Sequence, residues 1–344
     1  MSKDLVLENN QLLLEVKGLS KFFPIRNKGF LRKTTGEVRA VDDVSFSIRQ
    51  GETLGLVGES GCGKTTTARC IMRAINASGG QILFRQPDGK IVDVASLRHK
   101  HLLPLRRQIQ MIFQDPYASL NPRMNILNII GEPLLVAGGM KDREQRIERV
   151  SQLLRLVGLR PEYMQRFPHA FSGGQRQRIV IARALALNPS LVVADEPVSA
   201  LDVSVQAQVL NLMVKLQKEF NLTYLFVAHD LSVVKHICDR VIVMYVGKIV
   251  EMAPTNALFT APRHPYTSAL MSAVPEPDPK RRADMVPLEG EVPSPANPPL
   301  GCHFHPRCPH AIAVCKTKAP EFRELSPGHM ARCHRADELA LPGV

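Results

Sequence analysis

Short apolar runs separated by longer amphipathic stretches dominate the first 250 positions of the chain. Apolar residues that are continuous, or that recur at about every second position, predict strands. Strands are expected at 12–20, 37–48, 54–57, 82–84, 109–113, 191–194, 223–228 and 241–245. Helices are expected at 64–74, over most of 125–187 and at 205–220. Strands that alternate with helices predict an α/β fold whose mostly parallel sheet is covered on both faces.

Two stretches depart from this alternation. Residues 115–187 are almost entirely helical in pattern and are interpreted as an inserted helical subdomain. Beyond Arg263 the periodicity fades, and the proline-rich stretch 275–299 is expected to be an extended linker. The predicted organisation is an α/β core from 1–114 and 188–262, a helical subdomain at 115–187, and a C-terminal extension at 263–344.

Composition narrows the class of protein. The chain has 344 residues, of which 44% are hydrophobic, which is enough for a large core. We see no apolar run near the ~18–20 residues that cross a bilayer, and the first eleven residues carry acids and no apolar signal region. A soluble, cytoplasmic protein is therefore expected. The net charge of +12 suits a nucleotide, a nucleic acid or an anionic membrane surface equally well.

A glycine-rich segment after the apolar run at 54–57 carries the clearest chemistry. Gly58 to Thr65 fits the spacing G-x-x-x-x-G-K-[ST], which is typical of a phosphate-binding loop. Glycines let backbone N–H groups point at phosphate oxygens, and the following helix adds its positive end. Lys64 is expected to reach the β- and γ-phosphates, and the Thr65 hydroxyl to hold Mg²⁺. The predicted loop residues are Gly58, Glu59, Ser60, Gly61, Cys62, Gly63, Lys64, Thr65 and Thr66.

Four polar residues follow predicted strands at their carboxyl ends, which is where ligands bind in such sheets. Asp195 follows an all-apolar run and is expected to hold Mg²⁺, directly or through water. The adjacent Glu196 can polarise the water that attacks the γ-phosphate. Gln114 and His229 each follow another strand and are expected to orient the γ-phosphate or that water.

A second anion-binding segment lies at Ser172, Gly173, Gly174 and Gln175, at the start of a predicted helix. A serine hydroxyl, glycine N–H groups and a helix dipole together suit phosphate oxygens. If the two phosphate-binding segments face different nucleotides, two chains arranged head to tail would enclose two ATP molecules.

These motifs, in this order, resemble the ATP-binding subunits of ABC transporters. The loop at Gly58 resembles Walker A, and the run ending in Asp195 and Glu196 resembles Walker B with its catalytic glutamate. Gln114 falls at the Q-loop glutamine and His229 at the switch histidine. The resemblance implies a P-loop NTPase core, an antiparallel β subdomain and the inserted helical subdomain, with Thr65, Gln114 and Asp195 around Mg²⁺. It also assigns the segment from Phe171 to Arg178 to the signature motif, Ser199–Asp202 to the D-loop, and Phe23 to adenine stacking.

Three segments resemble the dipeptide and oligopeptide importers in particular. They are a transmembrane-coupling segment at Asp115–Arg123, an element at Arg263–Thr267, and a C-terminal extension around Pro293–Cys308. The loop glycines around Cys62 are similar to the F-type subunit, which implies a D-type paralogous subunit as partner in a heterodimer. A homodimeric ATPase is the alternative.

The resemblance implies an ATPase that converts ATP and water to ADP and phosphate and powers peptide uptake. Its implied partners are two transmembrane permease subunits and, through them, an extracytoplasmic peptide-binding protein, at the cytoplasmic face of the inner membrane. One rival is a soluble ABC ATPase that acts on nucleic acid or the ribosome, but aromatic residues are only 5% and Trp is absent. A subunit with an inactive site is disfavoured by Lys64, Asp195, Glu196 and His229. The cargo stays open among dipeptides, longer peptides, glutathione and a metal complex.

Four of the seven cysteines cluster in the extension, at Cys302, Cys308, Cys315 and Cys333. Four thiolates can ligate a [4Fe-4S] cluster, which some members of the resembled family carry. Zinc is the alternative, because four histidines lie close in sequence, although the short C-x₂₋₄-C pair usual for zinc is missing. Reduced thiols without a metal are the third interpretation.

Overall fold

The computed structural model describes residues 7, 9, 11–26, 34–272 and 290–343. Most of the predicted linker at 275–299 therefore lies outside the described residues. Contacts between residues divide the chain into two units, each described by itself below. Unit 1 comprises 1–14, 48–52 and 84–226, and unit 2 comprises 15–47, 53–83 and 227–344. No helix among the described residues is long and apolar enough to cross a membrane.

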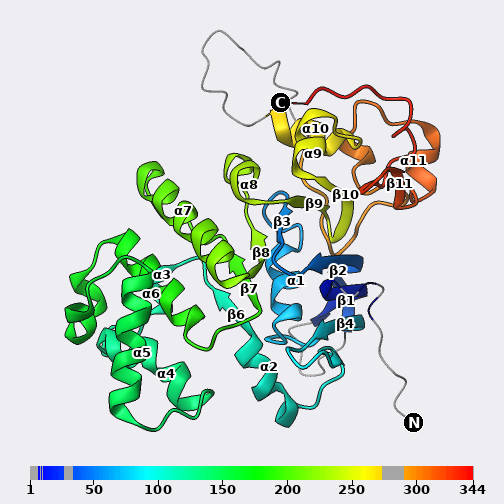
Figure 1. Ribbon diagram of the computed structural model, residues 1–344. Helices are drawn as coiled ribbons and strands as arrows, with labels where there is room; N and C mark the ends of the chain where they lie inside the picture. Colours follow the sequence, from blue (N-terminus) through cyan, green and yellow to red (C-terminus); the bar gives the residue numbers. More distant parts are fainter. Residues whose placement is uncertain (1–6, 8, 10, 27–33, 273–289, 344) are drawn as a thin grey trace. The chain divides into compact units, whose positions relative to one another are not determined.

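The strands of unit 1 lie in the order β8-β7-β6 (Figure 1). β6 and β7 run parallel, with Ile109 opposite Leu191 and Ile112 opposite Ala194. Every residue of β7 and β8 is buried, which explains why the apolar residues at 191–194 and 224–227 are continuous rather than alternating. The bounds are β5 (Ile91–Asp93), β6 (Ile109–Ile112), β7 (Leu191–Asp195) and β8 (Thr223–Val227).

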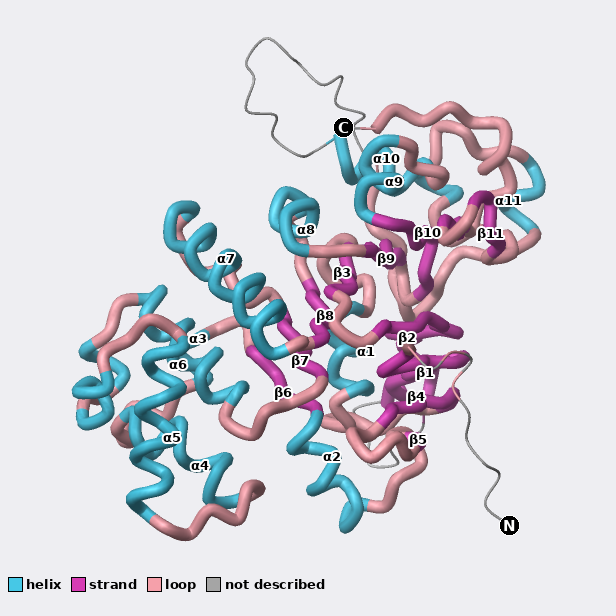
Figure 2. Tube along the Cα trace, viewed as in Figure 1, coloured by secondary structure: helices cyan, strands magenta, loops and turns pink. Residues whose placement is uncertain are grey.

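Helices make up most of the rest of unit 1, as Figure 2 shows in cyan. α4 and α5 pack against α6, and α6 also packs against α7. Asn125, Asp142 and Ser172 accept hydrogen bonds from backbone N–H groups in the first turns of α4, α5 and α6, so side chains fix where these helices begin. The bounds are α2 (Leu102–Gln108), α3 (Pro116–Ser119), α4 (Ile126–Val136), α5 (Arg143–Leu156), α6 (Gly173–Leu185) and α7 (Val203–Phe220).

Unit 2 contains a sheet with the order β11-β12-β10-β9-β3. β3 and β9 are parallel, with Leu56 opposite Ile242, whereas the pairs β9–β10, β10–β12 and β11–β12 are antiparallel. A second sheet has the order β2-β1-β4. The bounds are β1 (Leu12–Arg26), β2 (Thr34–Arg49), β3 (Thr53–Val57), β4 (Gly79–Arg85), β9 (Arg240–Tyr245), β10 (Lys248–Pro254), β11 (Arg323–Ser326) and β12 (His329–Ala331).

The helices of unit 2 are short. α8 packs against β3 and α9, and α9 also packs against β9 and β10. α1 follows β3 directly after a glycine-rich loop, and a short 3₁₀ turn at His305–Arg307 precedes α11. The bounds are α1 (Lys64–Ile71), α8 (Leu231–Ile237), α9 (Thr255–Thr260), α10 (Pro265–Ser272) and α11 (Ala313–Thr317).

A buried carboxylate on β10 binds two later segments of the chain. Glu251, which is fully buried, accepts hydrogen bonds from the backbone N–H groups of Arg263 (2.7 Å) and His264 (2.9 Å). Its Oε1 also lies 2.7 Å from Nε2 of His329 on β12. A buried charge is tolerated only when it is paired or hydrogen-bonded in this way. Glu251 therefore adds hydrogen bonds to the contact that β10 makes with the segments that follow it.

An aromatic cluster, made of Tyr245, His264, Tyr266 and Phe304, packs beside this carboxylate. The ring centroids lie 4.6–5.7 Å apart in tilted and edge-on arrangements. Burial lowers the pKa of His264 to about 3, so its ring is neutral, and its Nδ1 accepts the Tyr266 N–H at 3.1 Å. Aromatic burial of this kind is a main source of core stability.

The sequence-based strands and helices fall where the structure has them, with shifted ends. β6 ends at Ile112, and Phe113, placed in that strand by the sequence, is 45% exposed. α1 ends at Ile71 rather than 74. The short elements that the sequence patterns did not predict are α2, α3, α8, α9, α10, α11, β5, β10, β11 and β12.

Candidate nucleotide site

The loop from Gly58 to Gly63 connects β3 to α1 and requires its glycines. Gly58, Gly61 and Gly63 have φ angles of +147°, +78° and +111°, which L-residues rarely adopt. A Cβ on Gly63 would lie 2.2 Å from the Ala40 carbonyl oxygen, and one on Gly58 would lie 2.2 Å from that of Met244. Both backbone conformation and close packing therefore select glycine at the two ends of the loop.

Lys64 is buried at the start of α1. Its Nζ donates to the carbonyl oxygens of Gly58 (2.7 Å) and Glu59 (3.0 Å), so the ammonium group lies inside the curve of the loop. α1 begins without a side-chain cap, because its N-cap residue is Gly63. Backbone N–H groups at an uncapped helix start can bind an anion. Burial raises the pKa of the neighbouring Cys62 thiol, which keeps that side chain neutral.

Glu59 is held from outside the loop by two residues of the C-terminal extension. Its backbone N–H donates to the hydroxyl of Tyr266 at 2.8 Å. Its carboxylate accepts from both terminal nitrogens of Arg307, at 2.8 and 3.1 Å. No sequence pattern indicates these roles of Tyr266 and Arg307, since a contact across 207 or 248 positions leaves no local signal.

Two of the predicted catalytic residues are in contact in unit 1. Nε2 of Gln114 donates to Oε2 of Glu196 at 2.9 Å. Glu196 has a φ of +48°, in the left-handed region, and such strain clusters at functional sites. Asp195, at the end of β7, is buried. Both acids and the glutamine therefore lie at the carboxyl ends of the parallel strands β6 and β7, as their positions in the sequence indicated.

His229 and Phe23 lie in unit 2 and are both exposed. His229 follows β8 and precedes α8, and Phe23 lies on β1 with its side chain 40% exposed. The Lys21 ammonium lies 4.8 Å from the centre of the Phe23 ring. An exposed ring flanked by a cation is available to stack on a base. The roles assigned to these two residues stay predictions.

The signature segment begins α6. The Ser172 hydroxyl accepts the Gln175 N–H, and the Gln175 side chain accepts the Ser172 N–H, which makes a capping box. A Cβ on Gly174 would lie 2.3 Å from the Val205 side chain of α7, so only glycine fits there. Ser172 and Asp202, the last residue of the predicted D-loop, are both exposed. The segment is therefore an accessible helix start, as the sequence indicated.

The four clustered cysteines come from loops and short elements of the extension. Burial raises the pKa of Cys302 to about 12 and that of Cys333 to about 11, and the neighbouring thiols contribute in the same direction. The thiols are therefore close enough to affect one another's ionisation. Among the described residues, however, no group of three or more His, Cys, Asp or Glu is arranged to hold a metal ion.

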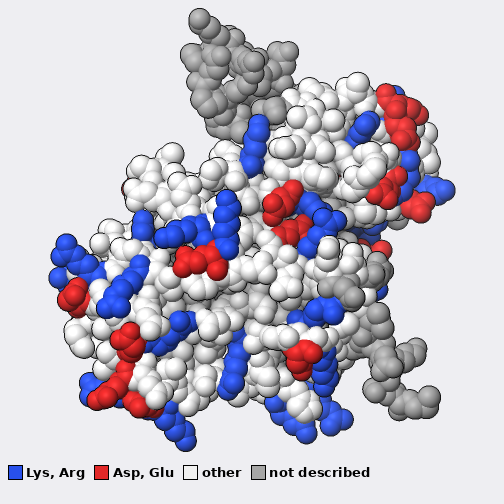
Figure 3. Space-filling model, viewed as in Figure 1, with Lys and Arg blue, Asp and Glu red and all other residues white. Residues whose placement is uncertain are grey.

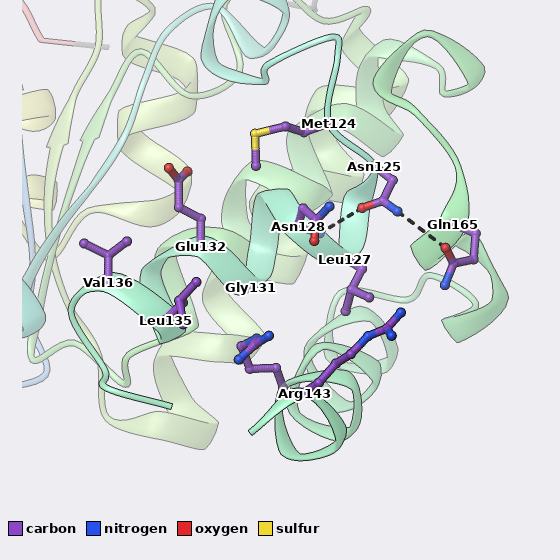
Figure 4. A pocket seen from close by; sticks show the side chains of 11 residues that line it. Met124, Asn125, Leu127, Asn128, Gly131, Glu132, Leu135, Val136, Arg143 and Gln165 are labelled. Atoms are coloured by element: carbon purple, nitrogen blue, oxygen red, sulfur yellow. Dashed lines mark hydrogen bonds between the residues drawn. The ribbon is translucent and has the colours of Figure 1, made fainter. Parts of the chain in front are cut away.

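A pocket of about 410 Å³ lies in the helical part of unit 1 (Figure 4). α4 supplies its apolar wall through Leu127 and Leu135, and Arg143 at the start of α5 borders it. Asn125 closes one end by hydrogen-bonding the Asn128 backbone N–H and the Gln165 side chain. Apolar side chains beside it stay exposed, and Val136 is 68% exposed.

Known proteins with similar sequences are named for transport systems. Residues 41–199 match the ABC transporter family, and residues 250–315 match the oligopeptide/dipeptide transporter C-terminal region. The chain is 54% identical over 328 residues to the oligopeptide transport ATP-binding protein AppF of Bacillus subtilis, covering 95% of this chain and 98% of that protein. A relative from Sinorhizobium fredii, also named for a peptide ABC transporter, is 53% identical over 322 residues, covering 94% and 89%.

Solved structures agree at the level of the fold. A dimeric post-hydrolysis state of the ATP-binding cassette MJ0796, bound to ADP and phosphate, is 27% identical with a TM-score of 0.61 and covers 71% of this chain and 99% of that one. The protein cbiO1 of Clostridium perfringens is also 27% identical, with a TM-score of 0.60, and covers 72% and 91%. By its sequence relatives and its fold, the chain belongs to the ABC transporter family, in the group of ATP-binding proteins of oligopeptide and dipeptide transporters.

Proposed function

We propose that this chain binds and hydrolyses ATP, and that the hydrolysis powers uptake of peptides by an ABC importer. The phosphate loop carries the proposal, because its glycines adopt the left-handed conformations that turn N–H groups inward and its lysine is buried within the curve. The names of the relatives, which refer to peptide transport, support the cargo class.

The residue roles follow from chemistry and from the family. Lys64 and the loop N–H groups bind the β- and γ-phosphates. Thr65, Gln114 and Asp195 would hold Mg²⁺, whose charge neutralises the phosphate oxygens. Glu196 acts as the base toward the attacking water. The observed Gln114–Glu196 contact supports a shared task, since the amide can orient that carboxylate.

His229 is the proposed γ-phosphate sensor, and Phe23 the proposed adenine platform. Ser172 and the glycines after it are proposed to complete the site of a second subunit, so that two subunits pair head to tail around two ATP molecules. The accessible start of α6 supports this role. The proposed second subunit is a D-type paralogue, and a homodimer is the alternative that a mass measurement of the assembled complex would reveal.

The pocket beside α4 is proposed to receive a cytoplasmic loop of a permease subunit. It follows directly on the segment Asp115–Arg123, identified by resemblance as the transmembrane-coupling segment. Within that segment Tyr117 is 62% exposed, and Arg183 of α6 donates to the Ser119 carbonyl at 2.6 Å. An exposed apolar rim on a packed helical support suits a partner protein. The complex would place this chain at the cytoplasmic face of the inner membrane, with an extracytoplasmic peptide-binding protein on the other side.

Exchange of Glu196 for Gln tests the mechanism. The variant keeps the size and the contact with Gln114 but loses the base, so it should bind ATP and stabilise the closed pair with little turnover. The complex reconstituted with its permease subunits is assayed for phosphate release and for retained nucleotide. Phosphate release near the wild-type rate would refute the assigned role.

For the extension, we propose a [4Fe-4S] cluster on Cys302, Cys308, Cys315 and Cys333. Four thiolates are the ligand set that such a cluster requires, and the mutual effect of the thiols on their pKa values supports their proximity. The lack of a group arranged to hold a metal ion among the described residues bears on zinc and on the cluster alike. Bound there, the cluster would cross-link the loops of the extension. Iron analysis and absorbance near 400 nm of anaerobically purified protein test this, and colourless, iron-free protein would end the idea.

The soluble alternative, an ABC ATPase that acts on nucleic acid, gains no support. On the face shown in Figure 3, Lys and Arg groups are interspersed with Asp and Glu groups. The relatives reported above are named for peptide transport. Co-purification decides directly, because permease subunits identify the importer and nucleic acid identifies the rival.

A further inference from the structure

We propose that Arg307 is a positioning residue of the ATP site: by pairing with Glu59 it cancels a negative charge inside the phosphate loop and fixes the loop for the triphosphate. The inference rests on the proposed ATP site and extends it, because it brings the C-terminal extension into nucleotide binding. Nothing in the phosphate-loop spacing requires such a partner.

The pair has the geometry of a strong and specific interaction. Both terminal nitrogens of Arg307 donate to the two carboxylate oxygens of Glu59, at 2.8 and 3.1 Å, which is the bidentate arrangement. The Arg307 side chain is only 5% exposed, and that of Glu59 is 24% exposed. An arginine guanidinium is always charged in proteins. A charge so far removed from water requires its partner.

Arg307 is itself held from behind. Its Nη1 also lies 3.4 Å from the Tyr245 hydroxyl, and its guanidinium carbon lies 5.9 Å from the centre of that ring. Phe304, three residues earlier, packs into the aromatic cluster with Tyr245. The guanidinium is therefore presented to the loop by a packed support and does not reach it from a mobile surface.

Glu59 is fixed at three points, and each point bears on the loop. Its carboxylate accepts hydrogen bonds from Arg307, and its backbone N–H donates to the Tyr266 hydroxyl at 2.8 Å. Its carbonyl oxygen accepts a hydrogen bond from Lys64 Nζ at 3.0 Å. The last contact matters most, because Lys64 is the proposed phosphate ligand. A displaced Glu59 would move a carbonyl that sets where the ammonium group rests.

Charge gives a second reason for the pair. ATP brings several negative charges to a loop that binds them through N–H dipoles and one lysine. An unpaired carboxylate at Glu59 would repel them at short range, where screening by salt is weak. With Arg307 present, the pair is neutral and the loop retains its affinity for the anion.

The test compares ATP affinity in four full-length proteins, measured by calorimetry. R307Q leaves Glu59 unpaired and should weaken ATP binding by about tenfold, the size expected for one nearby charge. E59Q/R307Q removes both charges and should return to within about threefold of wild type. R323Q is the matched control, because Arg323 is an exposed arginine of the same extension paired with Asp337, and its affinity should not change.

Wild-type affinity in R307Q, or no recovery in the folded double variant, would overturn the proposal. Circular dichroism establishes that each variant is folded. Should R307Q fail to fold, R307K takes its place: it keeps the charge but loses the fork, and about threefold weaker binding is expected. Wild-type affinity in R307K would then overturn the positioning role. If the wild-type chain itself binds no ATP, the proposed function fails, which is a separate outcome.

Discussion

Replacing Phe304 with alanine should destabilise unit 2 more than any change at its surface. The side chain is 1% exposed and lies 5.3–5.7 Å, centroid to centroid, from three rings of the aromatic cluster. Truncating it removes a whole ring from between Tyr245, His264 and Tyr266. Tyr266 cannot move into the space without giving up its hydrogen bond to the Glu59 backbone N–H, and His264 cannot do so without giving up its hydrogen bond to the Tyr266 N–H.

The size of the loss follows from the volume removed. A buried phenylalanine cut to alanine costs about 3–5 kcal/mol, combining lost burial with the cavity left behind. Edge-on ring contacts add about 0.5–1.5 kcal/mol, part of which is already counted in that range. The loss is therefore a large fraction of the total stability of about 5–15 kcal/mol for a typical protein. Phe304→Leu retains most of the volume and should cost about 1.5 kcal/mol.

Urea unfolding of the full chain, followed by near-ultraviolet circular dichroism, measures both variants. The chain has no Trp and five Tyr, so tyrosine dominates this signal, and Tyr245 and Tyr266 stand in the cluster itself. The alanine variant should lose the signal at markedly lower urea, and the leucine variant should lie between it and wild type. A loss below about 1 kcal/mol for alanine, or equal losses for the two variants, would contradict the packing argument.

Three further predictions concern the loop, the extension and α6. Gly63→Ala should abolish ATP binding, because its Cβ would lie 2.2 Å from the Ala40 carbonyl oxygen. Gly61→Ala, whose Cβ has no neighbour within 4 Å, should lower the ATP affinity by about tenfold or less in the same calorimetric titration. Burial lowers the pKa of His264 to about 3, so the free energy of unfolding should fall as the pH drops below about 6.5, by about 2 kcal/mol at pH 5. His264→Gln should flatten that part of the curve of stability against pH. An unchanged slope would contradict the assignment. Ser172→Ala should lower the free energy of unfolding by about 1 kcal/mol, seen as a lower melting temperature, because it removes the cap of α6. It should also reduce ATP turnover in the assembled complex. Wild-type turnover in this variant would show that the serine is not part of the proposed site.

Local patterns predicted the central elements because those elements obey local rules. Residues 191–194 of β7 and 224–227 of β8 form continuous apolar runs because both strands are buried throughout. The phosphate loop is recognisable from the spacing of its glycines. Along α5, Val150, Leu153 and Leu154 are buried, at the spacing expected for the apolar face of a helix. The contact between Gln114 and Glu196 follows from their places after adjacent parallel strands.

The extension escaped prediction for an equally physical reason. Its elements are too short to show a period: β12 has three residues and α11 has five. Its organisation depends on contacts between distant positions, such as Arg307 with Glu59 and His329 with Glu251, which no window of sequence contains. The roles of the nucleotide-site residues and the proposed domain boundaries stay predictions.

The buried position of Glu251 has a practical consequence for laboratories that wish to express a minimal cassette. Cutting the gene after codon 262 would retain this acid while discarding both amides and the imidazole that solvate it. The shortened product would have to open the packing around β10 so that water could reach the carboxylate. A minimal cassette should therefore extend through His329, or should carry an apolar residue in place of Glu251.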